Sequence, residues 1–297
     1  MKEVLNMDLR RGALLMLTGM AIIGLIDNFV VRIAEYAGLW QFHFLRAVLA
    51  LPMLVGIGLV LGSRLLPQRV WAVVLRSFFL AASMLIYFGS IPLMPISIVV
   101  ACLFTSPVFV LLFSVVVFGQ RIGVFRVFAV LLGFAGVLLI LNPGGDFSAA
   151  MLLPVLAGAL YALNAITARR FCADEDTIAM LIAFFSMLGL FGLIGLSVFD
   201  AGMEARFPER GWVAPSKELW FWLLIQAAGS IVAVGLLTRA YQGAETTYLV
   251  TFEYSLLIFA SFWAWVLYGD AVSVQAAIGM GLIIASGVII AIRSGPG

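Results

Sequence analysis

The 297-residue sequence is poor in charge, in histidine and in cysteine. Charged side chains make up 11% of the chain, which holds one histidine, His43, and two cysteines far apart from each other, Cys102 and Cys172. So few ligands cannot build a typical zinc site. A single histidine also leaves almost no serine or cysteine with a base beside it, which disfavours hydrolase chemistry. The sequence therefore predicts neither a metal centre nor an enzyme.

Two transport mechanisms lack their signatures as well. The chain has no G-x-x-x-x-G-K-[ST] phosphate-binding loop, which excludes transport driven by ATP bound to this chain. It also has no motif for a carbonyl-lined ion filter, so nothing suggests a channel. We expect no cofactor and no nucleic-acid partner. The expected partners are a small-molecule substrate and the lipid bilayer, with the chain acting as a monomer or a weak homodimer.

The chain is instead very rich in apolar residues, at 64% with a mean hydropathy of +1.16. A soluble domain is about half apolar and about a quarter charged. One globule cannot bury so much apolar surface, so the solvent of this chain must be lipid. The sequence predicts an all-α integral membrane protein with ten transmembrane helices, each long enough to cross a bilayer. The predicted spans are Gly12–Val31, Gln41–Gly62, Val70–Ile91, Pro95–Phe118, Gly123–Leu141, Ala149–Arg169, Ile178–Phe199, Lys217–Ala240, Glu245–Leu267 and Ser273–Ile292.

The basic residues are distributed unequally between the two sides of this topology. Twelve fall on the side of the N-terminus and five on the other. Since cytoplasmic loops carry an excess of Lys and Arg, this bias places both termini in the cytoplasm. The twelve are Lys2, Arg10, Arg11, Arg64, Arg69, Arg76, Arg121, Arg126, Arg169, Arg170, Arg239 and Arg293, and the five are Arg32, Arg46, Arg206, Arg210 and Lys217.

The ten spans divide into two related halves, residues 1–142 and 143–297. Phe118-Gly119-Gln120 in the first half corresponds to Tyr268-Gly269-Asp270 in the second, and each is followed by a glycine-containing helix. Because five is odd, the second half must enter the membrane upside down. Inverted repeats of this kind enclose a site near the midplane that opens alternately to either face.

These junctions, Phe-Gly-Gln-Arg and Tyr-Gly-Asp-Ala, together with the two five-span halves, resemble the drug/metabolite transporter superfamily, specifically its EamA-type ten-helix carriers. The family usually carries Gly-Glu where Gln120 and Asp270 follow glycine here. The resemblance implies a multi-pass carrier of the bacterial inner membrane. It also implies export of amino acids, including aromatic ones, or transport of another small metabolite. It carries over no binding residue by motif.

Glu253 is the sharpest candidate for a substrate site. It lies near the middle of the ninth span, beside Tyr254, whereas its counterpart in the first half is roughly Leu103. A charge inside a span is costly unless it is paired or hydrated, and so tends to mark function. A structural hydrogen bond to a neighbouring helix is the alternative.

A second group of candidates lies toward the outer side. Asp27 in the first span could meet a substrate ammonium, or could instead pair with Arg46. His43 and Arg46 are three residues apart, hence on one face of the second span, where they could hold a carboxylate or phosphate. Arg46 could otherwise snorkel to the interface, and His43 could lie among lipid headgroups.

Uncharged side chains complete the predicted site. Asn164 supplies uncharged polarity in the sixth span. Tyr87 could line an aromatic cavity, although such a residue more often faces lipid or packs against a neighbouring helix. Pro107, in the middle of the fourth predicted span, is a hinge candidate because proline removes a backbone donor and bends a helix.

Three hypotheses for function remain open. The first is a carrier of a zwitterionic amino acid, with Glu253 or Asp27 at the ammonium and Arg46 or His43 at the carboxylate. The second is a carrier of organic anions or of lipophilic or quaternary cations, the latter using Glu253 with an aromatic cage. The third is a membrane enzyme or a scaffold that transports nothing.

Overall fold

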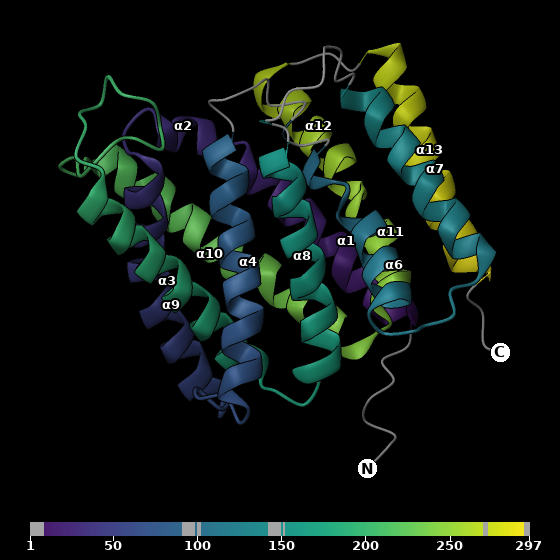
Figure 1. Cartoon of the computed structure of the whole chain (residues 1–297). Coiled ribbons are helices and arrows are strands. Elements are labelled where there is room, and N and C mark those ends of the chain that lie inside the picture. The colour runs from purple at the N-terminus through teal and green to yellow at the C-terminus, as the bar shows by residue number, and fades with distance from the viewer. Residues whose placement is uncertain are drawn as a thin grey trace.

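Helices account for nearly all regular structure in the described part of the chain (Figure 1). The computed structural model describes residues 9–90, 99, 102–141, 150, 152–269 and 273–293. Its helices are α1 (Leu9–Asp27), α2 (Val30–Ala34), α3 (Leu39–Leu61), α4 (Val70–Ser90), α6 (Ser106–Val116), α7 (Val124–Leu141), α8 (Leu152–Phe171), α9 (Thr177–Val198), α10 (Lys217–Gly243), α11 (Thr246–Glu253), α12 (Ser255–Tyr268) and α13 (Val274–Arg293).

Nine of the ten predicted spans coincide with these helices to within a few residues, and the all-α membrane fold is confirmed. The fourth, Pro95–Phe118, begins in residues that the structure does not describe and contains α6. Within the described residues, seven helical stretches are long and apolar enough to cross a bilayer, and α6, α7 and α13 are shorter apolar helices. The predicted turn at residues 142–146, with Asp146, lies outside the described residues, as does Asp270.

The two junctions that define the repeat have the same backbone conformation. Gly119 has φ +61° and Gly269 has φ +75°, and the two positions are 150 residues apart. Glycine has no Cβ and adopts this left-handed conformation without strain, which side chains rarely do. The shared glycine therefore has a physical reason: each junction ends a span by the same turn.

Two spans are interrupted, again at equivalent positions. In the ninth span α11 ends at Glu253 and α12 begins at Ser255, and in the fourth span α6 begins at Ser106, 149 residues before Ser255. Pro107 occupies the first turn of α6, where its missing N–H costs nothing. Pro107 therefore lies at a break within the fourth span and not inside a continuous helix, and its hinge role stays a prediction.

Helices of the first half pack mainly against helices of the second. The largest interfaces are α7 with α13, α3 with α9, α4 with α8, and α1 with α10. If spans of equal rank in each half are exchanged, the first two pairs map onto themselves and the last two onto each other. This is the contact pattern expected of two halves related by an approximate two-fold axis, and the division at residue 142 stays a prediction.

Small side chains bring α7 and α13 together. Ala129 and Gly133 of α7 are buried, and Ser286 Oγ donates to the Ala129 carbonyl at 2.7 Å. A Cβ on Gly279 would lie 2.6 Å from the Gly136 carbonyl oxygen, so the backbones touch. On α13 the buried face carries Gly279 and Ser286, whereas the small residues Ala277 and Gly281 are exposed.

The long connection between α9 and α10 is more than a solvated connector. Leu39 N–H donates to the Phe207 carbonyl at 3.0 Å, and Gln41 both donates to Val213 O and accepts from Val213 N. Arg210 Nη1 reaches the Ala34 carbonyl at 2.6 Å. The loop is therefore bonded to α2 and α3 at one end of the bundle (Figure 1, green loop).

Two basic residues counted as loop charges lie inside the protein instead. Arg46 is 6% exposed in α3 and Arg76 is 2% exposed in α4. One was assigned to each side, so eleven against four remain and the bias keeps its sign. Following that bias, we call the end where α1 begins the inner end and the opposite end the outer end.

The arginine distribution generates a topology prediction. Single cysteines replacing Arg121 and Arg206, both exposed, are expected to lie on opposite sides of the membrane in a background lacking Cys102 and Cys172. In intact cells a membrane-impermeant maleimide should label position 206 and not position 121. Labelling of position 121 from outside would overturn the assigned orientation.

Candidate functional site

A central cavity lies between the two halves, lined by residues of α1, α3, α4, α6, α8, α9, α10, α11 and α12. Its apolar lining is interrupted by charged and polar side chains from both halves. These are Asp27, Arg46, Arg76, Tyr87, Ser106, Tyr161, Asn164, Gln226, Ser230, Thr238, Tyr241 and Glu253.

Glu253 reaches this cavity from the break between α11 and α12. It is 2% exposed, and its Oε2 accepts a hydrogen bond from Ser106 Oγ at 3.4 Å. Its Oε1 is buried and has no hydrogen-bond partner among the described residues. Ser106 begins α6, so the two interrupted spans meet at this carboxyl group. An unfilled acceptor facing a cavity is placed to receive a proton or a cationic group.

Asp27 and Arg46 form a second charged group, nearer the outer end. Each is the charge that acts most strongly on the other, although no ion pair within 4.0 Å joins them. Asp27 is also hydrogen-bonded by the Gln226 amide, whose Oε1 accepts from Ser230 Oγ at 2.6 Å. The Asp27–Arg46 pair that the sequence suggested is therefore an interaction beyond ion-pair distance between two side chains that line the same cavity.

Arg46 has further partners on its own helix, α3, and on α9. Its Nη2 lies 3.3 Å from His43 Nδ1, and its guanidinium lies over the rings of Phe42 and Phe185 at 4.9 and 5.8 Å. The polar and aromatic surroundings of Arg46 thus already satisfy much of its charge.

Two predicted site residues do not reach the cavity. His43 is fully buried between the rings of Phe42 and Phe88, behind Arg46. Tyr254 is also fully buried, and its hydroxyl donates to the Val130 carbonyl at 3.4 Å. Neither belongs to the cavity lining, so their positions favour packing and support of the helix break.

Asn164 and Tyr87 do line the cavity, as the sequence suggested. Asn164 is 3% exposed, and its Oδ1 has no partner among the described residues. Tyr161 lies three residues before Asn164 on α8, and the charges of both Glu253 and Arg76 act on its hydroxyl. Tyr161 therefore lies within electrostatic range of an acidic and a basic residue of the cavity.

Arg76 is the functional candidate that sequence reasoning missed. It was counted with the cytoplasmic junction, yet it lies six residues inside the predicted third span. Its depth within that span was the signal that could have revealed it. Its Nη2 donates to Thr238 Oγ1 at 2.8 Å, whereas Nε and Nη1 are buried without a partner among the described residues.

A second, more polar pocket lies at the inner end, among residues that include Arg121, Arg170 and Glu245. Glu245, just before α11, forms an ion pair with Arg126 of α7 and accepts a hydrogen bond from Thr247 Oγ1 at 2.8 Å. Because both partners are partly exposed, this pair is worth at most about 1 kcal/mol. It links α7 of the first half to the start of α11 at the inner end.

Within the described ranges, no three His, Cys, Asp or Glu side chains gather as a metal site would require. The cavity instead offers separate acidic and basic groups in an apolar, aromatic container. This arrangement suits the binding of a small charged or zwitterionic molecule.

Comparison with known proteins gives a family and several relatives. Residues 10–142 match the EamA-like transporter family. The riboflavin transporter of Brucella anthropi is 28% identical over 82% of this chain and 83% of its own length, and that of Vibrio cholerae is 26% identical over 87% and 85%. The S-adenosylmethionine uptake transporter of Rickettsia bellii is 24% identical over 76% and 73%.

The fold has a close match as well. A protein of known crystal structure superposes with a TM-score of 0.79 over 95% of this chain and 98% of its own, at 18% identity. The likeness covers the whole arrangement of helices, the second half included.

The Asp27–Arg46 pair generates a prediction. Asp27→Asn or Arg46→Gln alone leaves one buried charge without its opposite, and should lower the free energy of unfolding by about 1–3 kcal/mol. Removing both charges should cost no more than removing one, because no uncompensated charge remains. Thermal denaturation of the purified singles and the double mutant measures this. Additive losses would show that the two side chains act independently.

Proposed function

We propose that this chain, whose residues 10–142 match the EamA-like transporter family, is a carrier of that family and moves a zwitterionic metabolite across a bacterial inner membrane by alternating access. It is a secondary carrier of small molecules and not an enzyme, as the sequence predicted. Both halves contribute to its cavity, which supports the proposal that the second half is an inverted copy of the first.

The observation that carries the substrate proposal is the pairing of opposite charges in one apolar cavity. Glu253 has an unfilled oxygen acceptor, and arginine donors lie in the same space. An α-amino-acid head group has one ammonium and one carboxylate, and would satisfy both. Tyr87, Tyr161 and Phe184 surround the cavity and suit an apolar or aromatic side chain. Amino acids, including aromatic ones, are therefore the proposed substrates.

The substrates that the relatives are named for add further candidates to the proposed class of amino acids. S-adenosylmethionine, which the Rickettsia relative is named for, carries an α-amino-acid head group together with a sulfonium cation and an aromatic base. Riboflavin, which other relatives are named for, has aromatic rings and hydroxyl groups but no zwitterion, and is the second candidate. Export remains the proposed direction, although the S-adenosylmethionine relatives are named for uptake.

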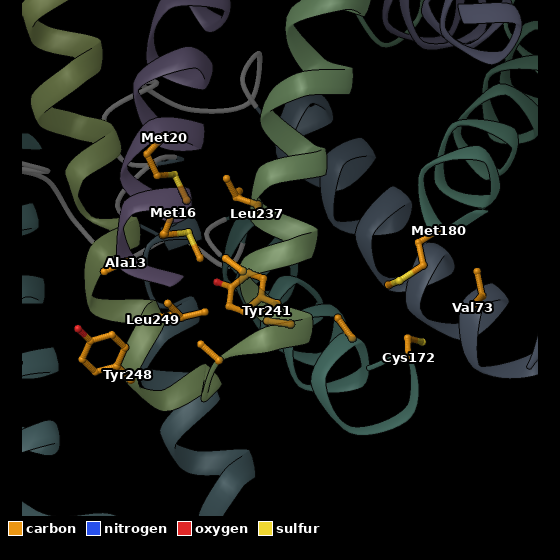
Figure 2. Close-up of a cluster of buried hydrophobic side chains, with 14 of the residues drawn as sticks. Ala13, Met16, Met20, Val73, Cys172, Met180, Leu237, Tyr241, Tyr248 and Leu249 are labelled. Atoms are coloured by element: carbon orange, nitrogen blue, oxygen red, sulfur yellow. The ribbon is translucent and has the colours of Figure 1, made fainter. Parts of the chain in front are cut away.

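Alternating access requires a barrier that opens at the inner end, and a cluster of apolar side chains there is the proposed barrier. Figure 2 shows Met16 of α1 beside Tyr241 of α10, with Leu237 above and Leu249 below. The cluster contacts both halves of the chain. Its separation would connect the cavity with the inner face.

A first prediction tests the substrate class through Glu253. In proteoliposomes, the wild type is expected to take up at least one of L-phenylalanine, L-methionine and S-adenosylmethionine. Glu253→Gln keeps the volume and removes the charge, so it should abolish this transport or its pH dependence while leaving thermal stability near that of the wild type. Glu204→Gln, a change in the exposed outer loop, is the matched control and should behave as the wild type.

Two results would count against the proposal. Uptake of riboflavin alone would favour the second candidate substrate. Unchanged uptake with an intact pH profile in Glu253→Gln would reduce Glu253 to a structural hydrogen-bonding residue.

A second prediction tests the inner barrier. A Cβ on Gly12 of α1 would lie 2.8 Å from Ala244 Cβ at the end of α10. A disulfide needs about 3.8 Å between these atoms, so a shift of about 1 Å would admit one. In a background lacking Cys102 and Cys172, the double mutant Gly12→Cys, Ala244→Cys should lose transport on oxidation and regain it on reduction.

The two single mutants are the controls for this experiment and should not respond to oxidant. Full transport by the cross-linked protein would show that α1 and α10 do not separate at the inner end during the cycle.

A further inference from the structure

We propose that Arg76 binds the anionic group of the transported molecule, a carboxylate or a phosphate, at the inner end of the cavity. This rests on the proposed transport function and changes its chemistry, because the sequence assigned the anion to Arg46 and His43. The assignment follows from what each arginine already contacts.

Arg76 has hydrogen-bond donors that nothing in the described structure uses. It is 2% exposed, lines the cavity, and makes one hydrogen bond, to Thr238 Oγ1. Nε and Nη1 remain without partners. Leaving a charged donor unsatisfied away from water is costly, so such an arrangement indicates a site that a ligand or water completes.

Among the described residues, no acidic side chain compensates the charge of Arg76. The groups found to interact with it electrostatically are Cys172 and Tyr161, and a thiol and a phenol are neutral near pH 7. Arg46, in contrast, faces Asp27, His43 and two aromatic rings. Of the two buried arginines, Arg76 is the one whose charge a substrate anion would compensate.

The corresponding span of the second half also distinguishes Arg76 from a purely structural residue. α10, the span of equal rank in the second half, contributes the neutral amide of Gln226 to the same cavity. Gln226 is neutral and has partners: it donates to the Ile26 carbonyl at 3.3 Å and accepts from Ser230 Oγ. A scaffold role would be met by the neutral amide in both halves. Because a guanidinium lines the cavity from just one of these two spans, we infer that it serves a ligand and not the shared scaffold.

The surroundings of Arg76 suit a carboxylate or phosphate. Tyr241, on α10 three residues after Thr238, also lines the cavity, and its hydroxyl has no partner among the described residues. A planar guanidinium with two free N–H groups matches two oxygens of either anion. On the inner side the apolar cluster begins with Leu237 and Tyr241, so the anion would lie next to the barrier (Figure 2).

Glu253 completes a binding site for a zwitterion. Both its charge and that of Arg76 act on the Tyr161 hydroxyl, so both residues lie within electrostatic range of one side chain in the cavity lining. The carboxylate of an amino acid at Arg76 and its ammonium at Glu253 would each meet an unfilled partner.

The test compares pairs of compounds that differ only in the anionic group. Purified full-length protein is titrated in a thermal-shift assay with L-phenylalanine against phenethylamine, S-adenosylmethionine against its decarboxylated form, and riboflavin 5′-phosphate against riboflavin. The first two pairs test a carboxylate and the third tests a phosphate. The wild type should bind the anionic member of at least one pair more tightly by about 10- to 100-fold, the usual range for charged hydrogen bonds.

Arg76→Gln should abolish this preference, Arg76→Lys should retain part of it, and Arg46→Gln should leave it within about threefold, less than the loss of one hydrogen bond. The melting temperature of Arg76→Gln without ligand should equal or exceed that of the wild type, because the change removes an uncompensated buried charge. A purely structural arginine would instead give a lower melting temperature.

Two outcomes overturn the assignment: no anion preference in the wild type, or the same preference in Arg76→Gln. Failure of the wild type to transport any of these compounds in proteoliposomes is a separate result. It would refute the transport proposal, whereas an anion preference lost in Arg76→Gln would still locate the anion site.

Discussion

A charged side chain inside a bilayer is tolerated only where water, a partner or a ligand compensates its charge. Asp27, Arg46, Arg76 and Glu253 all meet this condition by lining one cavity. The same condition applies to the backbone, whose broken helices are tolerated in a membrane only within protein or beside a water-filled space. The interruption at Tyr254 lies there, and it brings Glu253 to the cavity. The buried charges and the break between α11 and α12 therefore both depend on the central cavity.

Much of the fold was predictable because lipid imposes a simple rule on sequence. Continuous apolar stretches of bilayer length become spans, and the start of α10 at Lys217 and of α4 at Val70 were predicted to the residue. The interruptions were not predictable from hydropathy, because α11 and α12 together read as one apolar span. The packing face of α13 was also missed, since regular small residues at Ala277 and Gly281 look the same whether they face a helix or lipid.

Site residues were predictable where a charged side chain is rare within a span. They were not predictable where the direction of the side chain decides whether it reaches the cavity. Glu253, Asp27 and Arg46 stood out as charges within spans, and all line the cavity. His43 stood out for the same reason, yet its ring points into aromatic packing. Arg76 was not recognised as a site residue because it was counted among the loop charges. That count agreed with the predicted topology, so its position inside the third span was overlooked. Only three-dimensional contacts separate such cases.

The bonding of the loop between α9 and α10 constrains how the outer end can open. Five hydrogen bonds tie this loop, part of the second half, to residues 34–41 of the first. Helices α3 and α9 also form one of the largest interfaces. Rocking of one sequence half against the other would break all of these contacts at once. A rigid body that moved at the outer end would therefore combine parts of both halves, namely α3, α9 and the loop between α9 and α10, and its boundary would cross the proposed division of the repeat at residue 142.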